Sequence, residues 1–282
     1  MSKIVAVTNQ KGGVGKTTTC VNLAASLAAL KQDVLLIDLD PQGNATVGCG
    51  IEKHILETTA NEVLLGEAAI QDALITLPIG FDLLASNSDL TLAEVSLLQA
   101  DERENRLKDA LEPIKDKFHY IIIDCPPALN MLTVNALVAA DSVLIPMQCE
   151  YYALEGLTGL IGTINKLCET VNPRLQIEGL LRTMYDPRNS LTLQVSEQLQ
   201  SHFSDTLYTT TIPRNVRLAE APSFGLPALL YDKASSGAIA YLALAQEILN
   251  RNATGQVAQP RSEPGPQATT PILLKQRHQE VN

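Results

Sequence analysis

Lys11-Gly12-Gly13-Val14-Gly15-Lys16-Thr17-Thr18 lies between a short apolar run, Ile4 to Val7, and a segment with helical spacing. The run is partly β-branched, which is typical of a buried parallel strand. After the glycines, apolar residues recur at helical spacing from Val21 to Ala28. A glycine-rich turn from strand to helix leaves several backbone N–H groups unpaired beside the positive end of the helix dipole. The stretch therefore predicts a phosphate-binding loop.

Two side chains of the loop have expected roles. Lys16 is predicted to reach the β- and γ-phosphates of a nucleotide, and the Thr17 hydroxyl to ligate Mg²⁺. The general pattern is G-x-x-x-x-G-K-[ST], but here Gln10 occupies the first glycine position and a second lysine, Lys11, follows it. The alternative is a solvated lysine in an unrelated turn. The strand before, the helix after and the intact Gly-Lys-Thr favour the phosphate loop.

Carboxylates follow two other apolar strands. Val34 to Ile37 leads into Asp38 and Asp40, and Tyr120 to Ile123 leads into Asp124. Open parallel sheets bind ligands at this carboxyl edge. We expect Asp124 to hold Mg²⁺ directly or through water, Asp38 to support the ion or its waters, and Asp40 to orient a water toward the γ-phosphate. The alternative, polar turns capped by aspartate, is less favoured beside a phosphate loop.

Composition limits the partners and the class of protein. The chain has 282 residues, 45% of them hydrophobic, which is typical of a globular protein. Its formal charge of −10 argues against a surface that attracts nucleic acid everywhere, so DNA binding would require particular residues. No apolar run reaches the roughly 18 residues of a spanning helix, and we expect no signal peptide before the loop. The five widely spaced cysteines predict buried, reduced thiols.

Strands and helices alternate along the chain. This pattern predicts an α/β fold with a doubly wound, mostly parallel sheet and helices on both faces. We expect one domain over residues 1–251, with helical segments over 69–77 and 90–117. The last helix is expected to follow Ser235 and Ser236 with an apolar stripe that includes Ile239 and Leu249. Residues 252–282 are predicted to be a disordered Pro/Gln-rich tail.

With these residues in place, the chain resembles the ParA/MinD group of deviant phosphate-loop ATPases. It is most similar to the short chromosome-partitioning ParA proteins, often called Soj, over residues 2 to 250. The matching stretches are Lys11 to Thr18 with its extra lysine, Leu36 to Thr46, Ile122 to Pro127, Glu150 to Gly156 and Ile212 to Ser223. The resemblance implies the P-loop NTPase fold.

The same resemblance implies a function. It is that of a weak, Mg²⁺-dependent ATPase that forms a homodimer around two ATP molecules and binds double-stranded DNA non-specifically as a dimer. A ParB-type partner, held on a centromere-like site, stimulates turnover in this family. Lys11 would cross the interface to the phosphates of the neighbour's ATP, as an arginine finger does. We therefore expect a cytoplasmic, nucleoid-associated partitioning protein of chromosome or plasmid, without stable membrane insertion.

The resemblance also implies site residues. Lys11, Lys16 and Asp40 are the expected catalytic residues, and Thr17, Asp38 and Asp124 the expected Mg²⁺ site. The expected ATP contacts are Lys11, Gly12, Gly13, Val14, Gly15, Lys16, Thr17, Thr18 and Glu150, with Pro213 and Asn215 at the adenine. The DNA contacts that it implies are Arg188, Arg217 and Lys233. From the residues alone, arginines in polar loops are more often ordinary surface charges.

Three alternatives stay open. A membrane-cycling ATPase like MinD needs a basic amphipathic C-terminal helix, which the tail does not provide. An iron–sulfur ATPase like the nitrogenase iron protein needs cysteine ligands from two subunits, and neither Cys125 nor Cys149 stands in such a context. A non-catalytic nucleotide-binding scaffold is disfavoured because Asp40 and Asp124 are both retained.

Overall fold

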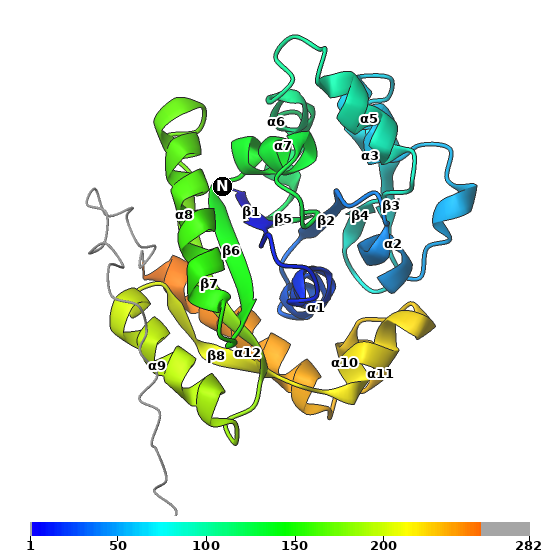
Figure 1. Ribbon diagram of the computed structural model, residues 1–282. Helices are drawn as coiled ribbons and strands as arrows, with labels where there is room; N and C mark the ends of the chain where they lie inside the picture. Colours follow the sequence, from blue (N-terminus) through cyan, green and yellow to red (C-terminus); the bar gives the residue numbers. More distant parts are fainter. Residues whose placement is uncertain (1, 255–282) are drawn as a thin grey trace, which may run out of the picture.

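The computed structural model describes residues 2–254. Within this part of the chain, eight strands form one sheet with the order β3-β4-β2-β5-β1-β6-β7-β8 (Figure 1). The strands are β1 Lys3–Val7, β2 Val34–Asp38, β3 Leu74–Thr76, β4 Asp82–Leu84, β5 Tyr120–Asp124, β6 Ser142–Gln148, β7 Gln176–Tyr185 and β8 Leu207–Pro213. All pairs are parallel except β3 with β4. The predicted mostly parallel α/β sheet is confirmed.

Helices cover both faces of this sheet (Figure 1). The α-helices are α1 Lys16–Ala29, α2 Asn44–Gly48, α3 Ala60–Leu65, α4 Ile70–Ala73, α5 Leu90–Leu97, α6 Arg106–Leu111, α7 Met131–Ala139, α8 Ala153–Thr170, α9 Ser190–Phe203, α10 Val216–Glu220, α11 Ala228–Tyr231 and α12 Ser236–Ala253. Short 3₁₀ turns are η1 Lys53–Ile55, η2 Lys115–Lys117 and η3 Ala221–Phe224.

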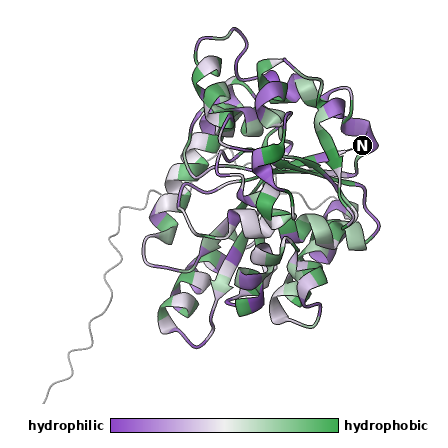
Figure 2. Cartoon of the chain, turned by 90° about the vertical axis from the view of Figure 1, so that its right-hand side faces the viewer, coloured by the Kyte–Doolittle hydropathy of each residue, from purple (hydrophilic) through white to green (hydrophobic). Residues whose placement is uncertain are grey.

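Two apolar cores form because successive strand residues point to opposite faces. In β1, Ile4 and Ala6 belong to the core beneath α3 and α5–α9, whereas Val5 and Val7 belong to the core beneath α1, α11 and α12. Buried on both faces, the central strands are apolar almost throughout, as Figure 2 shows for the interior of the molecule. At the carboxyl edge, β2 ends in Asp38, β5 in Asp124 and β6 in Gln148.

The strand order reverses direction at β1, which lies between β5 and β6. The chain leaves β1 through α1 toward β2 on one side, and leaves β5 through α7 toward β6 on the other side. The two connecting helices lie on opposite faces of the sheet. A crevice at the carboxyl ends of the strands is expected at such a reversal. The phosphate loop follows β1 directly.

Two predicted helices differ in the structure. The segment 69–77 is only one turn of helix, α4, and then becomes β3, because Leu74 to Thr76 pairs antiparallel with β4 at the edge of the sheet. The segment 90–117 is divided into α5, α6 and η2, with a turn before Arg106. Tertiary pairing thus overrides the local helical spacing.

The last helix begins as predicted but buries its predicted apolar stripe only in part. Ser235 is its N-cap and accepts a hydrogen bond from the Ala238 N–H at 3.2 Å. Its buried residues include Tyr241, Leu244 and Ile248, whereas Ile239 is 57% exposed. The predicted apolar stripe is therefore correct only in part: Ala245 is buried and Leu249 packs against the core, whereas Ile239 faces outward. The helix continues to Ala253, two residues beyond the predicted domain boundary, and residues 255–282 of the predicted tail lie outside the described residues.

Candidate nucleotide-binding site

The phosphate loop has the backbone of an anion cradle. Gly13 and Gly15 adopt left-handed conformations, with φ of 73° and 88°, and Gly15 is the N-cap of α1. A side chain at either position would be strained. Left-handed residues in such a loop allow backbone N–H groups to turn toward an anion at the start of α1, where the helix dipole adds positive potential. The predicted strand–loop–helix arrangement is confirmed.

Three polar side chains hold this loop against the neighbouring strands. The Asn9 amide donates to the Pro146 carbonyl at 2.8 Å, and its oxygen accepts from the Lys11 N–H at 3.0 Å. Gln148, at the end of β6, donates to the Gly13 carbonyl at 3.2 Å, and Thr183 in β7 donates to the Val14 carbonyl at 2.8 Å. Sequence reasoning missed these anchors. The available signal was a polar residue near the carboxyl end of each apolar strand.

Lys16 points back over its own loop. Its side-chain ammonium donates to the Lys11 carbonyl at 3.3 Å, and only 7% of the residue is exposed. Burial lowers the pKa of Lys16, and the charge of Asp124 opposes that shift. The Lys16 ammonium therefore lies beside the phosphate loop, where a bound phosphate would give it a partner of opposite charge.

Asp38 and Asp124 are adjacent in register and fully buried. Burial raises the pKa of Asp124 to about 8, with the charge of Asp38 as the next cause. Burial also raises the pKa of Asp38 to about 6, although hydrogen bonds from Thr46 and Asp40 oppose the shift. Two buried carboxylates at this separation repel each other when both are ionised. The pair is electrostatically suited to a cation.

The two carboxylates differ in the bonds that they already make. Asp38 accepts three hydrogen bonds, from the Thr46 N–H and hydroxyl at 2.8 Å each and from the Asp40 N–H at 3.1 Å. Asp124 accepts a contact from the Cys20 thiol at 3.4 Å on Oδ1. Its Oδ2 atom is buried without a well-directed hydrogen bond among the described residues, although the Thr17 hydroxyl is near enough to lower the pKa. Asp124 with Thr17 therefore fits a magnesium site better than Asp38 does.

Asp40 lies in a tight turn beside the pair. Its carboxylate accepts from the Gln42 N–H at 2.9 Å, and its backbone carbonyl accepts from the Gly43 N–H at 2.8 Å and the Ser86 hydroxyl at 2.9 Å. A Cβ at Gly43 would come within 2.7 Å of the Ser86 carbonyl oxygen, so only glycine fits there. The turn presents a half-buried carboxylate next to the phosphate loop.

Lys11 points away from its own loop. Its ammonium forms an ion pair with Glu150, which precedes α8, and both side chains are about half exposed, at 47% and 50%. Two exposed tyrosines, Tyr151 and Tyr152, follow Glu150 and stack edge to face with ring centroids 5.0 Å apart. The two lysines of the loop thus have different surroundings, since Lys16 is buried within the site and Lys11 faces outward.

The expected adenine turn leads from β8 into α10. The Asn215 side chain is already engaged, because its oxygen caps the Leu218 N–H at 3.3 Å and its nitrogen donates to Ser236 at 2.8 Å. Pro213 is the last residue of β8. Both residues lie at the carboxyl edge of the sheet, and the Asn215 amide is committed to contacts within the protein.

The expected DNA contacts are exposed but paired with acids. Arg188 makes a two-pronged pair with Asp186, and Arg217 contacts Glu220 at 2.7 Å and Asp232 at 3.4 Å. Lys233 is exposed beside Asp232. The structure therefore places all three on the surface, and Asp232, which pairs with Arg217, immediately precedes Lys233 in the chain. Sequence reasoning did not anticipate the acidic partners.

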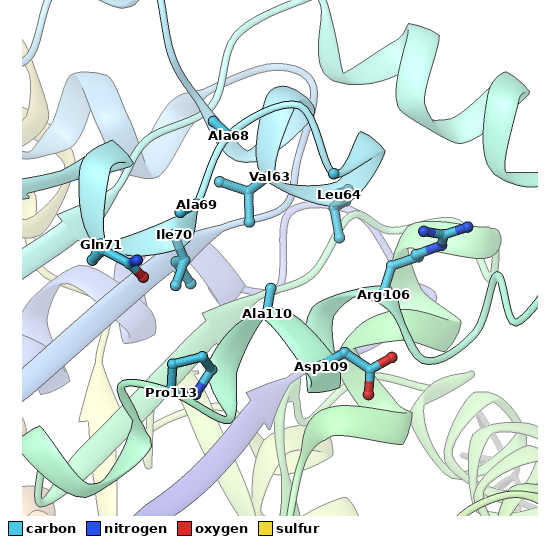
Figure 3. Close-up of a pocket in the computed structure, with 11 residues that line it drawn as sticks. Val63, Leu64, Ala68, Ala69, Ile70, Gln71, Arg106, Asp109, Ala110 and Pro113 are labelled. Carbon is cyan, nitrogen blue, oxygen red and sulfur yellow. The ribbon is translucent and has the colours of Figure 1, made fainter.

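Other features lie apart from this site. An open pocket of about 280 Å³ is lined by residues of α3, of the segment before and along α4, and of α6, including Arg106 and Asp109 (Figure 3). It shares no residue with the phosphate loop.

All five cysteines are free and four are buried, as predicted. Within residues 2–254, no three His, Cys, Asp or Glu side chains group together as a metal site, and no helix is long and apolar enough to cross a membrane.

The AAA domain family model matches residues 2–177. The chain is 52% identical to the sporulation initiation inhibitor protein Soj of Bacillus subtilis over 249 residues, which cover 88% of this chain and 98% of Soj. It is 51% identical to the chromosome partitioning protein ParA of Caulobacter vibrioides over 252 residues, 88% of this chain and 94% of that protein. The chain belongs to the ParA/Soj family.

Solved structures agree with this ParA/Soj assignment. Cobyrinic acid a,c-diamide synthase from Mycobacterium smegmatis, solved with an ATP analogue and magnesium, is 37% identical with a TM-score of 0.80, covering 90% of this chain and 97% of that one. The cell division ATPase MinD from Pyrococcus furiosus is 27% identical with a TM-score of 0.74, covering 89% and 99%. The phosphate loop of this ParA/Soj chain thus belongs to a fold family that binds nucleotide and magnesium.

Proposed function

We propose that the chain is an Mg²⁺-dependent ATPase that forms a homodimer around two ATP molecules and partitions a chromosome or plasmid. The observation that carries this proposal is the division between the two loop lysines. Lys16 lies over its own loop, whereas the ammonium of Lys11 is half exposed and paired only with the surface residue Glu150. A lysine held this way can exchange its carboxylate partner for a phosphate of a neighbouring molecule.

Hydrolysis requires few groups in this arrangement. The loop amides and Lys16 would hold the β- and γ-phosphates, and Thr17 and Asp124 would hold a magnesium ion, which supplies positive charge to neutralise the phosphates. Asp40 orients the attacking water. Lys11 adds a positive charge only after two subunits meet, so turnover waits for assembly. We therefore expect a slow enzyme that a ParB-type partner stimulates.

DNA binding follows from the same dimer. Arg188, Arg217 and Lys233 are too few to hold DNA strongly in a chain of net charge −10, but dimerisation doubles them. Multivalent phosphate contacts multiply affinity, and the binding weakens steeply with salt because counterions are released. ATP-dependent dimerisation thus makes non-specific binding to double-stranded DNA switchable. The protein would then cycle on and off the nucleoid in the cytoplasm.

Co-sedimentation with plasmid DNA tests the proposal. The full chain should sediment with DNA at low salt in the presence of ATP and Mg²⁺, and should stay in the supernatant with ADP. No binding in either nucleotide state would contradict the proposal. Flotation with anionic liposomes in the same buffers separates it from a membrane-cycling function like that of MinD, which predicts ATP-dependent flotation without DNA binding.

A further inference from the structure

The ends of β7 and β8 gather two arginines around one carboxylate. Tyr185 and Pro213 are register partners in parallel strands, so the residues that follow them, Asp186 and Arg214, emerge side by side at the carboxyl edge. Arg188 lies two residues beyond Asp186 in the same turn. The pKa of Asp186 is lowered to about 2, chiefly by hydrogen bonds from the Arg188 side chain and backbone, with a smaller contribution from the charge of Arg214. One acid thus faces two bases.

Asp186 occupies the Nε–Nη2 edge of the Arg188 guanidinium. The guanidinium Nε donates to Oδ1 at 2.9 Å and Nη2 donates to Oδ2 at 2.8 Å, while the Arg188 backbone N–H donates to Oδ1 at 3.0 Å. This parallel two-bond geometry is also the one with which arginine binds a phosphate. The Arg188 side chain is 88% exposed, so a phosphate can approach it from solvent. A DNA phosphate must displace the carboxylate to use the same donors.

We propose that Asp186 is a competing anion that holds down the affinity for DNA, and that Arg214 joins Arg188 in the phosphate contact that Asp186 blocks. This inference rests on the proposed binding of DNA. Arg217 is likewise paired with carboxylates of its own chain: Nη1 lies 2.7 Å from Glu220 and Nε lies 3.4 Å from Asp232. Each arginine thus exchanges a carboxylate of its own chain for a DNA phosphate when it binds. This exchange keeps the DNA affinity of one subunit low, so that appreciable DNA binding requires the dimer.

The expected gain can be bounded. An exposed ion pair corresponds to a factor of about 1.4 to 5 in an equilibrium constant. A dimer carries two copies, so removing the competing charge with Asp186→Asn should tighten DNA binding by about 2- to 30-fold. The gain should be largest at low salt, because released counterions then contribute most.

The test is fluorescence anisotropy with a labelled duplex of arbitrary sequence, using the full chain with ATP and Mg²⁺ at several salt concentrations. Asp186→Asn is compared with Asp116→Asn, which makes the same charge change on an exposed residue of η2, before β5 at the opposite edge of the sheet. The control should change affinity by less than about 2-fold. In a background of Arg188→Gln, Asp186→Asn should lose most of its gain, because its effect acts through Arg188. Arg214→Gln should weaken binding of the Asp186→Asn protein.

The outcomes separate the two claims. If the parent binds DNA but Asp186→Asn gains no more than Asp116→Asn, or keeps its whole gain without Arg188, the inference about Asp186 is wrong and the proposed function stands. If neither the parent nor any variant binds DNA with ATP at low salt, the proposed function fails and the inference with it. Thermal unfolding of each variant, with and without ATP, shows that the fold and the nucleotide site are retained.

Discussion

The buried pair Asp38 and Asp124 predicts how stability without magnesium depends on pH. The pKa of Asp124 is raised from 3.8 to about 8, chiefly by burial and next by the charge of Asp38. A carboxyl group whose pKa is higher in the folded state keeps its proton there while the unfolded chain releases it. Folding is therefore most favourable below about pH 4, and stability falls as pH rises toward 8.

The size of this effect follows from the shift. Within that window each pH unit costs about 1.4 kcal/mol for one proton, so raising the pH from 5 to 7 should remove about 3 kcal/mol of folding free energy. For a domain of this size that corresponds to a fall in Tm of about 6 to 12 °C. Asp38, with a pKa of about 6, adds to the fall at the lower end of the range.

Asp124→Asn should abolish most of this dependence. The amide cannot ionise, so the variant should lose the part of the fall in Tm from pH 5 to 7 that comes from Asp124, and keep only the smaller part at the lower end that comes from Asp38. Asp116→Asn, at an exposed position, should keep the slope of the parent. Magnesium and ATP should raise the Tm of the parent at pH 7 but not that of Asp124→Asn. Equal pH slopes for the parent and Asp124→Asn would refute the assignment of a buried, repelled carboxylate pair.

Three further predictions concern packing, assembly and DNA. Gly179→Ala should destabilise the fold by about 1 to 3 kcal/mol in urea unfolding, because the new Cβ would lie 2.3 Å from the Tyr208 ring; an unchanged midpoint would contradict this packing. Lys11→Ala should bind a fluorescent ATP analogue within a few-fold of the parent but fail to dimerise in sedimentation velocity; loss of both properties would place Lys11 in its own subunit's site. Arg217→Glu should weaken the affinity for DNA, measured by anisotropy, at least 10-fold while sparing the ATP-dependent dimer, and normal DNA binding would remove Arg217 from the contact surface.

The sequence determined the central part of this molecule through short-range patterns. The phosphate loop and the strand ends at Asp38 and Asp124 are local, since each depends on an apolar run followed at once by a polar residue. The anchors of the loop are not local. Thr183 contacts Val14 across 169 residues, and no spacing in the chain indicates that β7 lies near β1. Such contacts depend on strand order, which the sequence alone left open.

Errors in the fold arose where two patterns competed. The final helix has apolar residues on two sides, one that includes Ile239, which was predicted to be buried, and one that includes Tyr241, which is buried in the structure. Packing against α1 decides between them, because the Tyr241 hydroxyl lies 3.1 Å from that of Thr19. At β3, the antiparallel pairing with β4 determines the structure, although the spacing of apolar residues in that segment indicated a helix. The acidic partner of Arg188, Asp186, is only two residues away in the sequence. The sequence therefore contained both residues, but only the structure shows that their side chains pair.

The mass of the protein in solution tests the central claim most directly. The Asp40→Ala variant, which should hold ATP without hydrolysing it, is measured by light scattering with ATP and Mg²⁺, with ADP and Mg²⁺, and again after adding Lys16→Ala. We predict twice the monomer mass only with ATP and an intact Lys16, and the monomer mass in the other two cases. The same mass in all three would contradict a dimer assembled around ATP.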